Sequence, residues 1–239
     1  MKKIFTAMLC LAAIIIPGCG NSERDTGIEG IVDDFYKSDY EYQLTRKTTG
    51  ENGDEIVVVY EGKVIDSPYE EYVKVVEPQE GTLWSECYYT KKGLGGRLVM
   101  RTNDEVTEQA LVKREYPYGY GENLKFVADR EETVDGVMCE VYKAEYTQTV
   151  GGGMRSKETL EAVISQEYYV DKEKKQLTMI YTDLEDLYRK NAIINCMIGD
   201  SSLTLETAQK RADAEDYAAN ETLKIFNYNG EIEMTVLEP

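Results

Sequence analysis

The chain has 239 residues, a formal net charge of −18 and no histidine. The missing histidine excludes Ser-His-Asp and Cys-His catalysis and the HExxH zinc site, because each of them needs an imidazole. An acidic protein surface repels nucleic-acid phosphates and anionic lipid headgroups, so we expect no nucleic-acid partner. Hydrophobic residues make up 42% of the chain and tyrosine occurs 19 times, which is enough for a substantial core.

Residues 1–18 have the composition of a secretory signal peptide. Lys2 and Lys3 precede an apolar run from Ile4 to Ile16. That run is shorter than the roughly 20 residues that a transmembrane helix needs, and a small residue, Gly18, stands where a signal peptidase cuts. No later segment is apolar over a length that would span a membrane.

The stretch Ile16-Pro17-Gly18-Cys19 resembles the lipobox of bacterial lipoproteins. In that family a diacylglycerol is attached to the cysteine, which becomes the first residue after cleavage. The resemblance implies lipidation at Cys19, a polar tether over residues 19–26, and an extracytoplasmic protein held at the membrane of the cell envelope by its lipid. The alternative is a plain secreted protein that is cut nearby.

Three cysteines remain beyond the anchor, and they lie far apart in the sequence. None of Cys87, Cys139 and Cys196 belongs to a CxxC motif, so the sequence has neither a zinc knuckle nor a thioredoxin-like redox motif. Their odd number leaves at least one free thiol unless two molecules cross-link. Because Cys87 and Cys139 stand in alternating runs, we expect them to behave as small hydrophobic residues.

The first half of the domain is predicted as one helix followed by short strands. Ile28, Ile31, Val32, Phe35 and Tyr36 follow the spacing of an amphipathic helix. Alternation of apolar and polar residues begins at Tyr40 and indicates strands. Further strands are predicted at 55–65, 71–77, 82–90 and 96–102, with turns at 50–53 and 91–96; the run 105–116 fits a strand or a helical turn, and 117–126 fits a loop.

The second half continues this pattern. A strand is predicted at 136–150, a glycine-rich crossing at 151–153, and two strands within 165–183 around the Lys-rich turn 171–175; the run 183–198 is ambiguous. Leu205, Ala208 and Ala212 fall on one side of a helix predicted at 204–220. A final hairpin, 224–236, is predicted to turn at Asn229-Gly230.

Regularly spaced short strands with few helices predict an α+β, mostly β fold. We expect one curved antiparallel sheet or a partly closed barrel. The sequence contains no internal repeat and no domain break, so residues 27–239 are predicted to form a single domain.

The order of elements resembles the LolA/LolB-type lipoprotein-carrier fold. The residues that carry the resemblance are GIEGIVDDFYKSDYEYQLTRK (27–47), DREETVDGVMCEVYKAEY (129–146) and EYYVDKEKKQLTMI (167–180). The resemblance implies a half-barrel of about eleven strands, with helices in its concave face around an apolar cavity that holds acyl chains or another hydrophobic ligand.

A ligand in such a cavity would contact one face of the strands. Side chains alternate between the two faces of a strand, so Leu83, Cys87 and Tyr89 are expected on the face opposite Trp84. The predicted ligand-binding residues are Phe35, Leu83, Cys87, Tyr89, Leu98, Met100, Tyr142, Leu177 and Met179.

Other motifs favour structural interpretations. Lys91–Gly96 contains a GxGG run between two strands, which predicts a hairpin and not a dinucleotide site. Glu161, Glu167, Asp183, Glu185 and Asp186 include pairs that a glycosidase would need, but close pairs arise by chance among 45 acidic residues. Asn227, Asn229, Glu231 and Glu233 lack the loop pattern of a strong calcium site. Tyr116, Tyr118 and Tyr120 would suit a rim for a sugar or a hydrophobic ligand.

The sequence therefore predicts a non-enzymatic lipoprotein of the cell envelope, without cofactor or metal, that binds a hydrophobic or amphipathic ligand. Its partners are the membrane, through the lipid at Cys19, and a possible lipid; we expect a monomer. A surface glycan-binding module and an envelope scaffold without a small ligand are the alternatives.

The lipobox interpretation predicts the fate of a Cys19→Ala variant. Without the thiol no diacylglycerol is attached, and the acyl chains supply the membrane affinity. The variant is expected to leave the membrane fraction and to partition into the aqueous phase of a detergent extraction. Partitioning of the variant with the detergent, as for the parent protein, would show that the lipobox interpretation is wrong.

Overall fold

The computed structural model describes most of the chain after residue 26. The described ranges are 27–49, 53–76, 83–92, 95–102, 105–111, 124–152, 158–200, 202–215 and 217–238. The predicted signal peptide, Cys19 with the predicted tether, and Tyr116, Tyr118 and Tyr120 lie outside these ranges.

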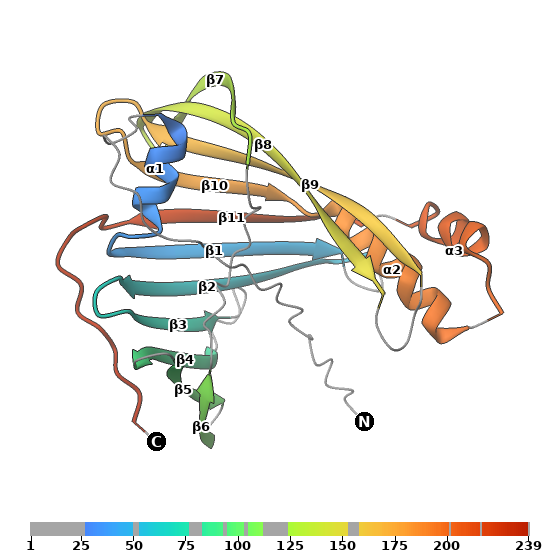
Figure 1. Cartoon of the computed structure of the whole chain (residues 1–239), viewed down its shortest axis with the longest axis horizontal. Helices are drawn as coiled ribbons and strands as arrows, with labels where there is room; N and C mark the ends of the chain where they lie inside the picture. Colours follow the sequence, from blue (N-terminus) through green and yellow to red (C-terminus); the bar gives the residue numbers. More distant parts are fainter. Residues whose placement is uncertain are drawn as a thin grey trace.

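Eleven strands form one antiparallel sheet in the order β6-β5-β4-β3-β2-β1-β11-β10-β9-β8-β7. The chain moves outward from β1 to β6, re-enters at the opposite edge as β7, and returns inward to β11, which pairs with β1 (Figure 1). The strands are β1 (Tyr40–Thr49), β2 (Glu55–Ile65), β3 (Glu70–Val76), β4 (Leu83–Lys92), β5 (Gly95–Thr102), β6 (Glu105–Leu111), β7 (Val127–Val134), β8 (Val137–Gly151), β9 (Thr159–Asp171), β10 (Leu177–Asp183) and β11 (Ala219–Phe226).

Three helices accompany the sheet in the described chain: α1 (Ile28–Phe35), α2 (Glu185–Gly199) and α3 (Leu205–Ala212). The sheet curves around the side that carries α1 and α2 (Figure 1). We call this side the concave face and the other the convex face. The predicted α+β, mostly β fold, a curved antiparallel sheet with helices over its concave face, is confirmed.

The two faces of the sheet differ in chemistry because side chains alternate along each strand. On β1, Tyr40, Tyr42 and Leu44 point to the concave face, and each is at most 2% exposed. Ion pairs between neighbouring strands occupy the convex face. They include Lys63–Glu41, Lys74–Glu61, Arg97–Glu108, Arg101–Glu86 and Lys143–Glu167.

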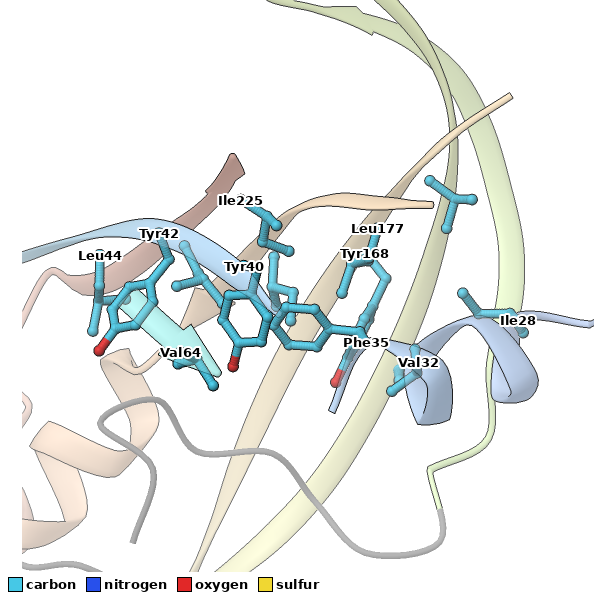
Figure 2. Close-up of a cluster of buried hydrophobic side chains, with 14 of the residues drawn as sticks. Ile28, Val32, Phe35, Tyr40, Tyr42, Leu44, Val64, Tyr168, Leu177 and Ile225 are labelled. Atoms are coloured by element: carbon cyan, nitrogen blue, oxygen red, sulfur yellow. The ribbon is translucent and has the colours of Figure 1, made fainter. Parts of the chain in front are cut away.

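Helix α1 closes one end of the concave face. Ile28, Val32 and Phe35 form the predicted apolar stripe, and all three are buried. The ring centroid of Phe35 lies 4.4 Å from that of Tyr40, and the Phe35 side chain is fully buried. Figure 2 shows Phe35 between Val32 and Tyr40, within a cluster to which β1, β2, β9, β10 and β11 contribute.

Helix α2 covers the other end of the same face and resolves the ambiguity of the run 183–198. Its Leu187 and Ile194 pack on Ala162 of β9 and Val150 of β8. Helix α3 packs mainly on α2, through Ala208 and Ala212. The helix that covers this end of the concave face is therefore α2, and the helix predicted at 204–220 packs on α2 instead.

The predicted helix at 204–220 is also too long. Helix α3 ends at Ala212, just after basic residues that suit a helix C-terminus, and acidic residues follow it. From Ala219 the chain forms β11, whose alternate residues Ala219, Leu223 and Ile225 are buried. Pairing with β1 and β10 on both sides outweighs the helix propensity of this alanine-rich segment.

The predicted C-terminal hairpin is wrong in its second half. The turn at 227–230 exists, with Asn227 and Asn229 at positive φ. Residues 231–238 form no strand, because β11 already pairs on both sides and offers no free edge. This segment instead crosses the convex face, where Leu237 packs with Tyr72, Tyr88 and Val99.

The strands β6, β7, β9 and β10 agree only in part with the predicted strands. The run 105–116 forms the strand β6 over its first part. The strand β7 was not predicted: its residues Val127–Thr133 are all exposed, so it lacks the alternation of buried positions that reveals a strand. The two strands around the Lys-rich turn are confirmed as β9 and β10.

Phe35 tests the contact between α1 and the sheet. Removing a fully buried ring leaves a cavity, so Phe35→Ala should lower the free energy of unfolding by about 3–5 kcal/mol. Phe226, which is 47% exposed, is the matched control, and Phe226→Ala should cost about 1 kcal/mol or less. Urea unfolding of both variants measures the difference; equal costs would contradict a core role for Phe35.

Leu237 tests the docking of the C-terminal segment on the convex face. Leu237 is 3% exposed, whereas its neighbour Val236 is 55% exposed. Leu237→Ala should lower the free energy of unfolding by about 2 kcal/mol, the lower end for a buried leucine, because the segment can relax at the chain end. Val236→Ala should leave it nearly unchanged. The docking is refuted when the two variants unfold at the same urea concentration as the parent.

Candidate ligand-binding face

A row of half-buried apolar side chains crosses the concave face on β2 to β5. Tyr60 pairs with Val75, and Cys87 pairs with Met100 in the sheet register. The main contacts of α1 and α2 with the sheet fall on β8 to β11. We call the following residues the apolar strip: Val58, Tyr60, Val75, Cys87, Leu98 and Met100, each of which is half-buried.

The structure brings part of the predicted ligand-binding set together. Cys87, Leu98 and Met100 belong to the apolar strip, and Tyr89 pairs directly with Leu98. Tyr142 and Leu177 lie on the same face but in the cluster under α1, together with Phe35. Contact of any of these residues with a ligand stays a prediction.

One of the predicted residues leaves this face because of a β-bulge. Leu177 pairs with Val170 and Met179 with the adjacent Tyr169, so Thr178 is an extra residue in β10. Met179 therefore packs on the convex face with Tyr169. Similarly, the register shifts so that Val76 pairs with Leu83, and the backbone at Leu83 is out of phase with the row of Cys87 and Tyr89.

Glycines let two tyrosine rings lie against the sheet on this face. A Cβ on Gly62 would stand 2.1 Å from Cζ of Tyr42, and one on Gly96 would stand 2.3 Å from Cε2 of Tyr89. Because no side chain other than glycine leaves that room, the rings form part of the floor beside the apolar strip. The Tyr42 hydroxyl donates to Oε1 of Glu71 at 3.1 Å, which helps to satisfy a carboxylate that is 1% exposed.

A row of polar residues crosses the middle of the concave face, between the regions that α1 and α2 cover. Arg46 of β1 pairs with Glu221 of β11, Glu221 with Thr182 of β10, and Thr182 with Gln166 of β9. Gln166 donates to the Thr182 hydroxyl at 3.1 Å and accepts from Tyr168 at 2.8 Å. We call Arg46, Glu221, Thr182 and Gln166 the polar row.

The ion pair is the charged end of the polar row. Nε and Nη2 of Arg46 both contact Oε1 of Glu221. Burial raises the pKa of the Glu221 carboxyl, and Arg46 opposes that rise. The Arg46 side chain is 25% exposed and that of Glu221 only 7%, so Arg46 is the member of the pair that faces solvent.

Three tyrosines surround the ion pair. The Arg46 guanidinium lies 5.6 Å from the ring centroid of Tyr60. Tyr188 of α2 interacts electrostatically with Arg46 and Glu221, and Tyr146 of β8 with Glu221. Burial, and then Glu221, raises the pKa of Tyr146 to about 12, and burial raises that of Tyr188. These hydroxyls therefore keep their protons at neutral pH and can donate hydrogen bonds.

The polar row is absent from the predicted site residues, although the sequence carries a signal for it. Arg46 stands two residues after Leu44 and Glu221 two residues before Leu223, on strands whose alternate positions are apolar. A charged residue at an apolar position of a strand is the signal. Only the register shows that these residues meet, because they come from opposite ends of the chain.

The carboxylates weighed for catalysis serve structural contacts. Hydrogen bonds from Arg130 lower the pKa of Glu167, whereas a general acid needs a raised pKa. Asp186 accepts from the backbone N–H of Val163 at 2.9 Å and contacts Arg189. Asn227 donates to the carbonyl of Glu231 within its turn. Among the described residues, no three or more histidine, cysteine or acidic side chains form a group that would hold a metal ion.

Comparison with known proteins gives similarity in structure only. No protein-family model matches the chain, and no curated protein matches its sequence. Lipoprotein LppX of Mycobacterium tuberculosis is 11% identical, with a TM-score of 0.43 over 84% of this chain and 92% of that one. LprF of Mycobacterium bovis is 8% identical, with a TM-score of 0.39 over 86% and 94%. A LolA superfamily protein of Nitrosomonas europaea is 9% identical, with a TM-score of 0.32 over 86% and 94%.

Within the residues that the structure describes, no helix combines the length and apolar character required to cross a bilayer.

The Arg46–Glu221 pair has a testable effect on stability. Arg46→Met leaves the Glu221 carboxylate buried without its partner, which should cost about 3–5 kcal/mol of unfolding free energy. In Arg46→Met/Glu221→Leu most of that loss should be recovered, because no uncompensated charge remains. The convex pair Arg97–Glu108 is the control, and Arg97→Met should change stability little. Chemical unfolding of the three variants measures these free energies. A double variant that is as unstable as Arg46→Met would contradict this account.

Proposed function

We propose that this protein is a non-enzymatic lipoprotein, anchored at the membrane of the cell envelope by a lipid on Cys19, that binds a hydrophobic or amphipathic ligand on its concave face. The domain that binds the ligand comprises residues 27–239. The observation that carries the proposal is the apolar strip: Val58, Tyr60, Val75, Cys87, Leu98 and Met100 are half-buried on one face of neighbouring strands.

The distribution of charge supports this proposal. Ion pairs occupy the convex face, so that face interacts well with water. The apolar strip on β2 to β5 carries valine, leucine, methionine, tyrosine and cysteine side chains. Methionine and tyrosine adapt to ligands of irregular shape, and apolar surface removed from water contributes about 25 cal/mol per Å² to binding.

The two ends of the concave face have different roles in this proposal. On β1 and β8 to β11, side chains under α1 and α2 are buried and form the stable core. On β2 to β5, the half-buried strip retains apolar surface for a ligand to cover. The lipid anchor holds the domain close to the bilayer, where amphipathic molecules are abundant.

The native cysteines allow a direct test of the ligand position. Cys87 is half-buried in the apolar strip, and Cys196 is half-buried between α2 and α3, away from the strip. A long-chain fatty acid added in increasing amounts to the delipidated domain should slow alkylation of Cys87 in a saturable way, because the acyl chain covers its thiol. Alkylation of Cys196 should keep its rate, and mass spectrometry of peptides measures both.

Each competing outcome has a clear meaning. Equal rates at Cys87 with and without fatty acid, together with no saturable binding, would overturn the proposal and favour an envelope scaffold. Protection of Cys87 by a soluble oligosaccharide but not by fatty acid would favour the glycan-binding alternative.

A further inference from the structure

We propose that Arg46 binds the anionic headgroup of an amphipathic ligand, carboxylate or phosphate, whose chain lies across the apolar strip. This inference rests on the proposed function and adds to it a charged headgroup site, a class of ligand and an orientation. The supporting observations are the position of Arg46, the hydrogen-bond donors around it, and the relative exposure of Arg46 and Glu221.

The first observation is the position of Arg46 at the edge of the apolar strip. Arg46 pairs with Val58 and lies over the ring of Tyr60, and both belong to the apolar strip. The polar row therefore ends where the apolar strip begins. From Arg46 on β1 to the end of the strip on β5 the path covers four strand spacings, about 19 Å at roughly 4.8 Å each. A single-chain amphiphile with its headgroup at Arg46 would follow this path.

Unused donors are the second observation. Nε and Nη2 of Arg46 contact Glu221, whereas Nη1 has no hydrogen-bond partner among the described residues. The hydroxyls of Tyr60, Tyr146 and Tyr188 likewise make no hydrogen bond within the described part of the chain. Arginine has donors only, and these hydroxyls can donate as well. A cluster of donors suits the oxygen atoms of a carboxylate or a phosphate.

The relative exposure of Arg46 and Glu221 indicates that the headgroup is negatively charged. A cationic headgroup would need Glu221, but that side chain is 7% exposed and its Oε1 is already occupied by Arg46. The guanidinium side of the pair is 25% exposed and lies next to the strip. Among the described residues on the concave face of β1, β2 and β11, Arg46 is also the only positively charged side chain. Tyrosine and aliphatic side chains lie around the Arg46–Glu221 pair.

The test compares three ligands that share one chain length: hexadecanoic acid, hexadecyl phosphate and uncharged methyl hexadecanoate. Each competes against an uncharged fluorescent amphiphile bound to the delipidated domain. The parent protein should bind the acid and the phosphate about tenfold more tightly than the ester, as expected for a charge-assisted hydrogen bond. The ratio of acid to phosphate affinity then tells whether a fatty acid or a phospholipid headgroup fits the site better; either order supports the inference.

Variants locate the effect. Glu221→Gln removes the competing carboxylate and should increase the preference for charged ligands. Arg46→Gln/Glu221→Gln removes both charges, so the preference should fall to about one while the ester binds as before. Arg97→Gln/Glu108→Gln removes an equivalent pair from the convex face and should behave as the parent protein. Tyr188→Phe, which keeps the ring, should weaken the preference severalfold and serves if the first double variant does not fold.

The outcomes separate this inference from the function on which it rests. When the ester displaces the probe as well as the acid and the phosphate do, the hydrophobic site stands and the headgroup site is overturned. Persistence of the tenfold preference in Arg46→Gln/Glu221→Gln also overturns it. When none of the three ligands displaces the probe and the probe itself does not bind, the proposed function fails together with this inference.

Discussion

A single-layer sheet has two faces, and an apolar face must be covered from water. The other features of this structure depend on that constraint. Alternate side chains point to opposite sides, so a strand with one apolar side needs a cover for that side. Here ion pairs between neighbouring strands occupy the convex face, whereas most of the concave face is apolar. Helices α1 and α2 provide the cover at the two ends of the strands, and Figure 2 shows Phe35 of α1 beside Tyr40 of β1.

The cover is unequal across the sheet, and this asymmetry links the fold to the proposed function. Under the helices the side chains are buried and contribute stability. On β2 to β5 the side chains of the apolar strip are half-buried, which is the condition of a surface that gains from contact with a ligand. The polar row stands at the border between these regions, where its ion pair costs desolvation energy that two leucines would not. The presence of an ion pair at this border, despite its desolvation cost, is explained if Arg46 positions a ligand, as we propose.

Local patterns in the sequence were enough for the α1 stripe, for most strands and for the overall half-barrel, because each depends on the spacing of apolar residues along one segment. The errors arise where distant segments decide. Bulges in β10 and beside Val76 change the phase of Met179 and Leu83, and alternation alone does not reveal an extra residue. The segment after Asn229 forms no hairpin because β11 is already paired on both sides. The polar row exists only through the register of strands from opposite ends of the chain.

The central claim is that the concave face carries an amphipathic ligand, and native mass spectrometry of the protein purified from its membrane in mild detergent tests it most directly. The account predicts a population heavier than the lipidated chain by the mass of one amphiphile, which leaves as an anion on gentle collisional activation. The Cys19→Ala variant, which cannot receive the proposed covalent lipid, should carry the same additional mass. A spectrum with only the mass of the chain itself, in both forms and at every detergent concentration, would contradict the account.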